Sequence, residues 1–265
     1  MAVTKNKVCF PITRSPDPAR SPDLVRRYYR ALLQRWGPQN WWPAQSRLEV
    51  IVGAYLTQNT AWSNVEKAIA GLRRAGVLSL KGIRRVPLPE LEQLVRPSGY
   101  FRQKAGRLKN FVEFLDARYG GSLSRMFAEP TGKLRAELLA LNGVGPETAD
   151  SILLYAGNHP VFVVDAYTRR ILERHGIIDV GTRYEEIRAL IEQAIGITER
   201  EALQVLRPGT EPRHPVSRIS VMRRSDLAQH YNELHALIVR TGVEYCRTTP
   251  RCEGCPLQRF LEHRP

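Results

Sequence analysis

Residues 141–150 constrain the fold more than any other part of this 265-residue chain. In this stretch Gly143 and Gly145 flank Val144, between two segments whose apolar residues recur at helical spacing. The two glycines allow a tight turn between helices, with peptide N–H groups directed outward at the start of the second helix. Such a turn can hold a phosphate without reading a base sequence, although an ordinary glycine-rich connection gives the same pattern.

The position of Asp165 gives this turn a chemical context. Asp165 follows the apolar run 161–164 and begins a new helical pattern. Burial of a carboxylate costs free energy unless helix-terminal amides or a ligand compensate it. An aspartate that only caps a helix would look the same if it stood alone. Together with the turn, Asp165 indicates a catalytic site, and we expect residues 161–164 to form a buried extended connector.

Helical periodicity extends over most of the remaining sequence. Ser63, with Glu66 three residues later, fits an N-terminal helix cap. Proline-rich residues 1–23 are expected to form a flexible basic arm, and the arginine-rich residues 207–224 a flexible loop. The expected helices are 24–36, 47–57, 63–75, 89–95, 103–119, 134–141, 165–175, 184–195 and 226–241.

The charge balance favours a polyanionic partner. Forty Lys and Arg residues against 26 Asp and Glu give a formal net charge of +14, and nucleic acids bind such surfaces with release of counterions. A merely basic surface, or adhesion to anionic lipid, is the alternative. No apolar run is long enough to span a membrane, and residues 1–8 lack the apolar stretch of a signal peptide. We therefore expect a cytoplasmic protein with no membrane partner.

The block 141–170 resembles the helix-hairpin-helix plus aspartate signature of the endonuclease III superfamily of DNA glycosylases, and the resemblance extends over most of residues 24–255. It implies an all-α, two-lobed helix-hairpin-helix fold with a cysteine loop near the C-terminus. Residues 24–49 plus 157–265 would form one lobe, and residues 50–156 a six-helix barrel lobe. The hairpin and Asp165 would lie at the junction of the lobes.

The resemblance also implies a partner and roles for single residues. The partner would be double-stranded DNA with a damaged base, bound by a nucleoid-associated monomer. Asp165 would stabilise the oxocarbenium-like sugar as the base leaves, or orient the attacking water. The residues implied to contact DNA are Gly143, Val144, Gly145 and Thr148.

One position in the hairpin distinguishes two chemistries within the superfamily. Bifunctional members carry a lysine two residues after the second glycine, and its amine forms a Schiff base with the sugar. Glu147 occupies that position here. A carboxylate cannot form a Schiff base, so we expect a monofunctional glycosylase that uses water. The alternatives are a bifunctional endonuclease acting on oxidised pyrimidines and a non-catalytic DNA-binding module.

The first half of the chain resembles the endonuclease III-like 3-methyladenine DNA glycosylases. In that subgroup aromatic residues matching Trp41, Trp42 and Trp62, with a proline matching Pro43, line the base pocket. Electron-rich aromatic faces also suit the positive charge of an alkylated purine. Tryptophans more often fill a core, to which we assign Trp36. The subgroup's C-terminal pocket lysine has no clear counterpart.

Two polar features admit both a functional and an ordinary interpretation. Gln58 occupies the place where the superfamily has a polar residue that fills the gap left by a flipped base, and a helix-capping role is the alternative. The cation-rich tract 96–109 could follow a phosphate backbone, or it could be a solvated helix face.

Three cysteines near the C-terminus, Cys246, Cys252 and Cys255, indicate a metal site. Their spacing resembles the iron–sulfur loop of the superfamily, which implies a [4Fe–4S] cluster. Leu261 stands at the fourth ligand position and cannot bind iron, so the fourth ligand stays open, with Cys9 and His263 as candidates. Zinc and a vestigial loop are the alternatives.

Overall fold

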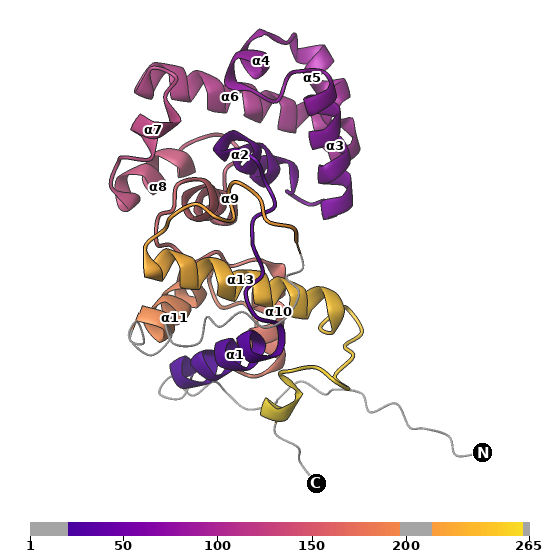
Figure 1. The fold of residues 1–265 in the computed structure, drawn as a ribbon, viewed down its shortest axis with the longest axis vertical. Helices are drawn as coiled ribbons and strands as arrows, with labels where there is room; N and C mark the ends of the chain where they lie inside the picture. Colours follow the sequence, from indigo (N-terminus) through magenta and orange to yellow (C-terminus); the bar gives the residue numbers. More distant parts are fainter. Residues whose placement is uncertain (1–20, 197–213, 262–265) are drawn as a thin grey trace, which may run out of the picture. The chain divides into compact units, whose positions relative to one another are not determined.

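A computed structural model describes residues 21–196 and 214–261, and every regular element in these ranges is helical. The all-α expectation is therefore confirmed for the described residues. The chain divides into two compact units (Figure 1). Unit 1 comprises Met1–Trp41, Phe162–Pro215 and Arg224–Pro265, and unit 2 comprises Trp42–Val161 and Val216–Arg223. These boundaries differ by several residues from those expected for the two lobes, whose assignment as domains stays a prediction.

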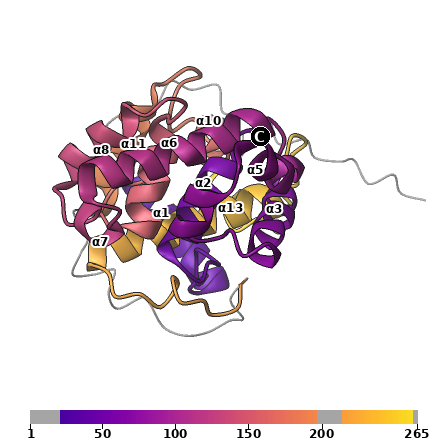
Figure 2. The ribbon, with the colours of Figure 1, turned by 90° about the horizontal axis from the view of Figure 1, so that it is seen from above.

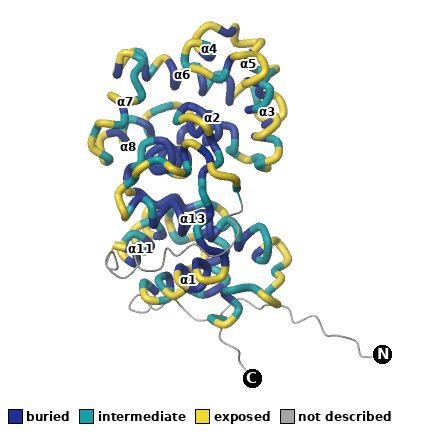
Figure 3. Tube along the Cα trace, viewed as in Figure 1, coloured by how far each residue is buried: buried dark blue, intermediate teal, exposed yellow. Residues whose placement is uncertain are grey.

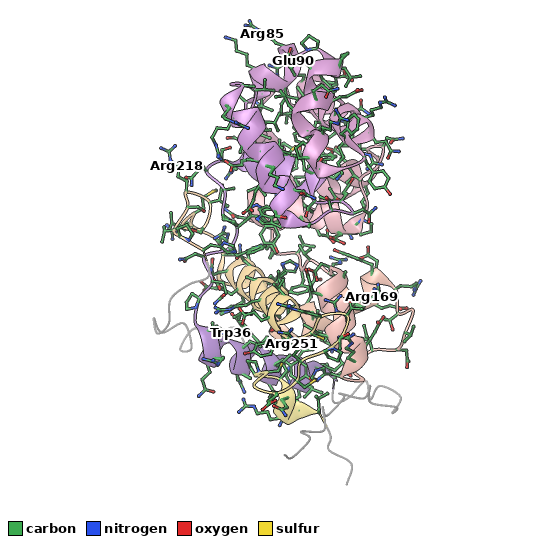
Figure 4. The ribbon with its side chains drawn as sticks, turned by 90° about the vertical axis from the view of Figure 1, so that its right-hand side faces the viewer. Trp36, Arg85, Glu90, Arg169, Arg218 and Arg251 are labelled. Atoms are coloured by element: carbon green, nitrogen blue, oxygen red, sulfur yellow. The ribbon has the colours of Figure 1, made fainter. Side chains whose placement is uncertain are left out.

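Unit 2 is a set of short helices around α2 and α6. Helix α6 packs against α4, α5 and α2, and α6 and α2 are seen from above in Figure 2. Arg85 and Glu90 are exposed and point outward from α4 and α5 (Figure 4). The helices of this unit are α2 (Arg47–Leu56), α3 (Trp62–Arg74), α4 (Leu80–Arg85), α5 (Leu88–Val95), α6 (Phe101–Tyr119), α7 (Leu123–Met126), α8 (Thr131–Leu139) and α9 (Pro146–Ser151), with a 3-10 turn at Arg96–Ser98 and a π-helical segment at Ile152–Ala156.

Helix α2 is buried along almost its whole length (Figure 3). Its N-terminus is closed by a reciprocal cap, in which Ser46 Oγ accepts from the amide of Glu49 and a Glu49 carboxylate oxygen accepts from the amide of Gln45. The other Glu49 oxygen accepts from Arg73 of α3 at 2.7 Å. This pairing explains how an acidic residue is accommodated on a buried helix.

Unit 1 consists of α1 (Ser21–Trp36), α10 (Ala166–Arg174), α11 (Tyr184–Gly196), α13 (Asp226–Glu244) and a 3-10 turn at Gln258–Phe260. Helix α1 packs against α11 and α13, and α13 packs against α10. Polar pairs join these helices in the core: Tyr28 Oη lies 2.6 Å from His175 Nδ1, and Tyr29 Oη lies 2.9 Å from His230 Nδ1. Trp36, labelled in Figure 4, is buried as expected for a core residue.

Several sequence expectations need correction. Helix α3 begins at Trp62 after Ala61, so Ser63 is not its cap. Helix α1 begins at Ser21, inside the segment expected to be a flexible arm. The short helices α4 and α7 were not expected. Residues 161–164 are buried and form a connector without strand pairing, as predicted.

The expectation of a flexible loop at 207–224 is wrong for its second part. The segment Val216–Arg223 packs within unit 2. Ser217 Oγ donates to the carbonyl of Trp42 at 3.0 Å, and the amide of Ile219 donates to the carbonyl of Ala44. Ile219 is itself buried. Residues 207–213 lie outside the described residues, as do residues 1–20 of the expected arm.

Candidate functional site

The hairpin of unit 2 is built around Gly143. Its φ of +76° is a conformation that side-chain-bearing residues rarely adopt. A Cβ on Gly143 would also lie 1.9 Å from Nε of Arg107, so the arginine packs directly on the glycine backbone. Val144 is buried, whereas Gly145 is exposed and precedes α9 without a side-chain cap. The hairpin therefore presents an uncapped helix start, which can accept an anion.

The side chain of Gln58 forms hydrogen bonds with this hairpin and with α9. Its Nε2 donates to the carbonyl of Gly143 at 3.0 Å and to Oγ1 of Thr148 at 2.9 Å. Its Oε1 accepts from Arg107 at 2.5 Å. Gln58 follows Thr57, the C-terminal cap of α2, and thus connects the end of α2 with the hairpin instead of capping a helix. The half-buried side chain joins residues that the sequence places far apart.

A buried ion pair connects helix α9 to helix α8. Asp150, which is fully buried, accepts from Arg135 of α8 at 2.7 and 3.1 Å. Glu147 lies in the first turn of α9 and is exposed. The lysine position of bifunctional relatives thus carries an accessible carboxylate at the start of the helix that follows the hairpin.

Asp165 caps α10 in unit 1. Its backbone is extended, and Oδ1 accepts from the amide of Thr168 at 2.7 Å. Its Oδ2 lies 3.5 Å from Nε2 of His235, and 13% of its side chain is exposed. Burial opposes ionisation, but His235 and the Thr168 amide outweigh it and hold the pKa of the Asp165 carboxyl below its ordinary value. The group is therefore an ionised, nearly buried carboxylate at neutral pH.

His235 is a site residue that sequence reasoning missed. It lies on α13, 70 positions after Asp165, and no local motif marks it. Its ring lies near two aromatic rings, at 6.1 Å from Phe162 and 6.5 Å from Trp41 between centroids. Only the packing of α13 against α10 brings it to the carboxylate. Trp41, expected in the base pocket, thus contacts His235, which in turn lies beside Asp165 in the same unit.

The other expected pocket aromatics lie in unit 2. Trp42 is buried and contacts Trp62 edge to face, with ring centroids 5.1 Å apart, and Tyr155 at 5.0 Å. Its ring also covers Gly53 of α2, where a Cβ would come within 3.2 Å. Trp62 is half-buried and donates to Glu66 from its ring nitrogen. Pro43 is half-buried. Trp42 is a packing residue of unit 2, and Trp62 leaves part of its ring accessible.

The cation-rich tract 96–109 is neither a continuous phosphate stripe nor a solvated face. Lys104 is buried, and its ammonium donates to the carbonyls of Leu56 and Ser98 at 2.9 and 2.6 Å. Burial, with a contribution from Arg107, lowers the pKa of Lys104 to about 8. Lys109 donates to two backbone carbonyls of its own unit. Arg96 and Arg102 stay exposed, on either side of the strongly exposed Tyr100.

The three C-terminal cysteines line one cavity of about 30 Å³ in unit 1, together with residues of α10. Arg174 donates to Sγ of Cys246 at 3.2 Å and to two backbone carbonyls of the loop. Arg251 of this loop is exposed (Figure 4). Leu261 lines the cavity where the superfamily has a fourth cysteine. Cys246 and Cys255 therefore face one space as free thiols, whereas Cys252 is disulfide-bonded, and the wall offers no fourth cysteine in the described part of the chain.

The described residues do not by themselves form a complete metal centre. Within 21–196 and 214–261, no three His, Cys, Asp or Glu side chains are grouped closely enough to hold a metal ion. The candidate fourth ligands Cys9 and His263 lie outside these ranges. None of the described helices is long and apolar enough to cross a membrane.

Comparisons with known proteins agree on one family. Residues 52–196 match the model of the HhH-GPD superfamily base excision DNA repair proteins. A Methanocaldococcus jannaschii protein assigned as a DNA repair glycosylase is 41% identical over 239 residues, covering 90% of this chain and 96% of that protein. Endonuclease III of Thermotoga maritima is 30% identical over 240 residues, covering 90% and 92%.

A solved structure is similar over most of the chain. The H. pylori 3-methyladenine DNA glycosylase bound to 1,N6-ethenoadenine superposes with a TM-score of 0.69 at 30% sequence identity. The match covers 84% of this chain and 97% of the other. The chain is therefore similar in fold to a DNA glycosylase of known structure.

Proposed function

Because the chain belongs to the HhH-GPD superfamily of base excision DNA repair proteins and is a DNA glycosylase, we propose that it excises an alkylated purine from double-stranded DNA by hydrolysis. The observation that carries this proposal is the ionised, nearly buried carboxylate of Asp165 at the start of α10. In this proposal a damaged base is flipped out of the duplex before its N-glycosidic bond is broken.

The role proposed for Asp165 follows from its charge. As the base departs, positive charge develops on the sugar, and a fixed anion in a weakly solvated place stabilises that charge strongly. The same carboxylate can orient the water that completes hydrolysis. A base that already carries positive charge is a good leaving group. Asp165 therefore needs no separate strong acid beside it for an alkylated purine.

The substrate class is supported by the aromatic residues. Trp41, Trp62 and Pro43 would offer aromatic and apolar surface to a flipped base, as expected from the resemblance, and the buried Trp42 would support Trp62 from behind. Cationic purines are favoured because the face of an aromatic ring attracts positive charge. The similarity to the H. pylori 3-methyladenine DNA glycosylase supports the same class.

The hairpin is proposed to bind the DNA backbone. Gly143, Val144 and Gly145 would present peptide N–H groups to a phosphate, with Thr148 held beside them by Gln58. In the structure Gln58 is bonded to the hairpin, so its proposed place in the gap left by the flipped base requires those bonds to open. The overall charge of +14 would favour this binding at low salt.

A second candidate is a bifunctional glycosylase and lyase, favoured by the similarity to an endonuclease III. Glu147 speaks against it, because the position of the Schiff-base amine carries an exposed carboxylate. We rank hydrolysis by water first for this reason.

We also propose that the cysteine loop holds a [4Fe–4S] cluster. Cys246, Cys252 and Cys255 line one cavity and would supply three thiolates once the disulfide at Cys252 is reduced, and the cationic Arg174 suits an anionic thiolate set. The fourth ligand would come from outside the described residues. The cluster would fix the loop against α10 and supply no step of bond cleavage.

A panel of duplexes, each with one lesion, tests the proposed substrate. Wild-type protein should release 3-methyladenine or 7-methylguanine as free base, without cutting the strand. Trp62→Ala should slow release because base–aromatic stacking contributes about 1–3 kcal/mol per base. Trp62→Phe, which keeps an aromatic face, is the matched control. Inactivity of the wild type on every alkylated purine, with activity on an oxidised pyrimidine, would contradict the proposal.

A further inference from the structure

A histidine outside the hairpin and aspartate motif lies against the proposed catalytic carboxylate. Nε2 of His235 is 3.5 Å from Oδ2 of Asp165, and both side chains are largely removed from solvent. His235 belongs to α13, which packs on α10, so two helices of unit 1 bring the pair together.

The two oxygens of Asp165 have different partners. Oδ1 accepts from the amide of Thr168, in the first turn of α10. Oδ2 lies beside Nε2 of His235 instead. A carboxylate held at one oxygen only can turn about the bond to its methylene. Contact with a second group at the other oxygen fixes the plane of the carboxylate.

The imidazole of His235 is itself held in place. Phe162 meets it edge to face, with an angle of 69° between the rings, and Trp41 meets it at 58°. Phe162 belongs to the buried segment just before Asp165. Close packing of this kind restricts the ring to one orientation, which a supporting residue needs if it is to orient another group.

We propose that His235 is a positioning residue for base excision, with its Nε2–H directed at Oδ2 of Asp165 so that the carboxylate plane is fixed from both sides. This inference rests on the role proposed for Asp165. His235 touches no reacting atom and acts only through the aspartate. A separation of 3.5 Å is consistent with this role, because hydrogen bonds of catalytic groups are often long before substrate binds.

Substitutions at His235 separate positioning from folding. His235→Leu removes the donor, and His235→Gln keeps an N–H at about the same reach. Single-turnover release of the base should fall on the order of 10- to 100-fold in His235→Leu, as for loss of a hydrogen bond to a charged group. His235→Gln should recover most of the rate. Affinity for abasic-site DNA should stay within a few-fold of wild type in both variants, since DNA binding does not use His235.

His230 provides a matched control on the same helix. It is buried and lies against Tyr29 instead of Asp165. His230→Leu should lower the thermal midpoint about as much as His235→Leu without the same loss of single-turnover rate. A wild-type rate in His235→Leu, or equal rates in His235→Leu and His235→Gln, would overturn the inference.

The protonated nitrogen of His235 can be identified without substrate, so this measurement does not depend on which base the enzyme excises. Nitrogen-15 NMR of the histidine rings should show the His235 proton on Nε2, and Asp165→Asn should shift that resonance. A neutral ring with its proton on Nδ1 would overturn the positioning role even if the enzyme is active. Inactivity of the wild type on alkylated DNA, with the proton on Nε2 as expected, would instead count against the proposed function alone.

Discussion

At the scale of single residues, the proposed chemistry rests on two carboxylates in different surroundings. Asp165 is nearly buried and ionised, because His235 and a helix-terminal amide favour its charge. Glu147 is exposed at the start of α9, where bifunctional relatives carry an amine. The first can stabilise a sugar cation, and the second cannot bond to it as an amine does.

The position of Glu147 predicts that no Schiff base forms. Borohydride should trap no covalent complex between the wild-type protein and abasic-site DNA. Glu147→Lys introduces an amine at the same place and serves as the positive control, in which a trapped band should appear. A strong band with the wild type would restore the lyase interpretation.

Sequence patterns located some of these residues and could not locate others. Asp165 and the hairpin glycines stand in one local motif, so the helix cap at Asp165 and the positive φ of Gly143 could be anticipated. His235 could not, because its contact with Asp165 depends on how α13 packs. The burial of Trp36 was expected correctly, whereas the burial of Trp42 against Trp62 and Tyr155 depends on tertiary packing and was not.

At the scale of helices, α6 organises the turns around the hairpin. Lys104 donates to the end of α2 at Leu56 and to Ser98, just before α6. Arg107, one turn later, holds Gln58 and covers Gly143. Helix α6 thus contacts the end of α2, the turn before its own start and the hairpin.

Burial of Lys104 predicts a pH dependence of stability. Its pKa in the folded protein is about 8, below the ordinary value of 10.5, so the unfolded chain binds the proton more tightly. The free energy of unfolding should therefore rise by about 1 kcal/mol between pH 7 and pH 9 and be lost again as pH falls through 8. Urea unfolding at the two pH values measures this rise.

Lys104→Met should flatten the rise, since the titrating group is gone. Lys109→Met is the control, because Lys109 also bonds to backbone carbonyls but is only half-buried. An equal slope in wild type and Lys104→Met would show that Lys104 keeps an ordinary pKa.

Periodicity predicted the long helices and failed for the short ones. Helices α1, α6 and α13 present repeated apolar residues over several turns, which fixes their existence although not their ends. The six residues of α4 and the four of α7 are too short to show a helical period. The N-terminus of α3 was misplaced because Ser63 fits a cap pattern, whereas the helix begins at Trp62 after Ala61, which makes no side-chain cap.

At the scale of the whole molecule, charge and the C-terminal loop are the features that single motifs do not explain. The excess of cations suits a long polyanion. Arginines of α10 bind the loop that carries the cysteines: Arg170 donates to the carbonyl of Cys246, and Arg174 to its sulfur. The loop is thereby connected to the helix that Asp165 begins.

The cysteine loop predicts iron in the purified protein. Prepared without oxygen, the protein should be brown and contain close to four irons per chain, since a [4Fe–4S] cluster holds four. Cys246→Ser should lose the iron, whereas Cys9→Ser and His263→Ala test the two candidate fourth ligands. Stoichiometric zinc would mean that the wrong metal was chosen, and a colourless, metal-free, fully active protein would show that the loop is vestigial.

The most direct test of the central claim is base release by Asp165→Asn. The substitution keeps the shape of the side chain and an oxygen for the Thr168 amide, but removes the charge proposed to stabilise the sugar cation. On a duplex carrying one alkylated purine from which wild type releases free base, we predict that the variant releases almost none and still binds abasic-site DNA nearly as tightly as wild type. Loss of an electrostatic stabiliser lowers the rate about 100- to 1000-fold. A variant that keeps more than a few per cent of the wild-type rate would therefore contradict the role of Asp165.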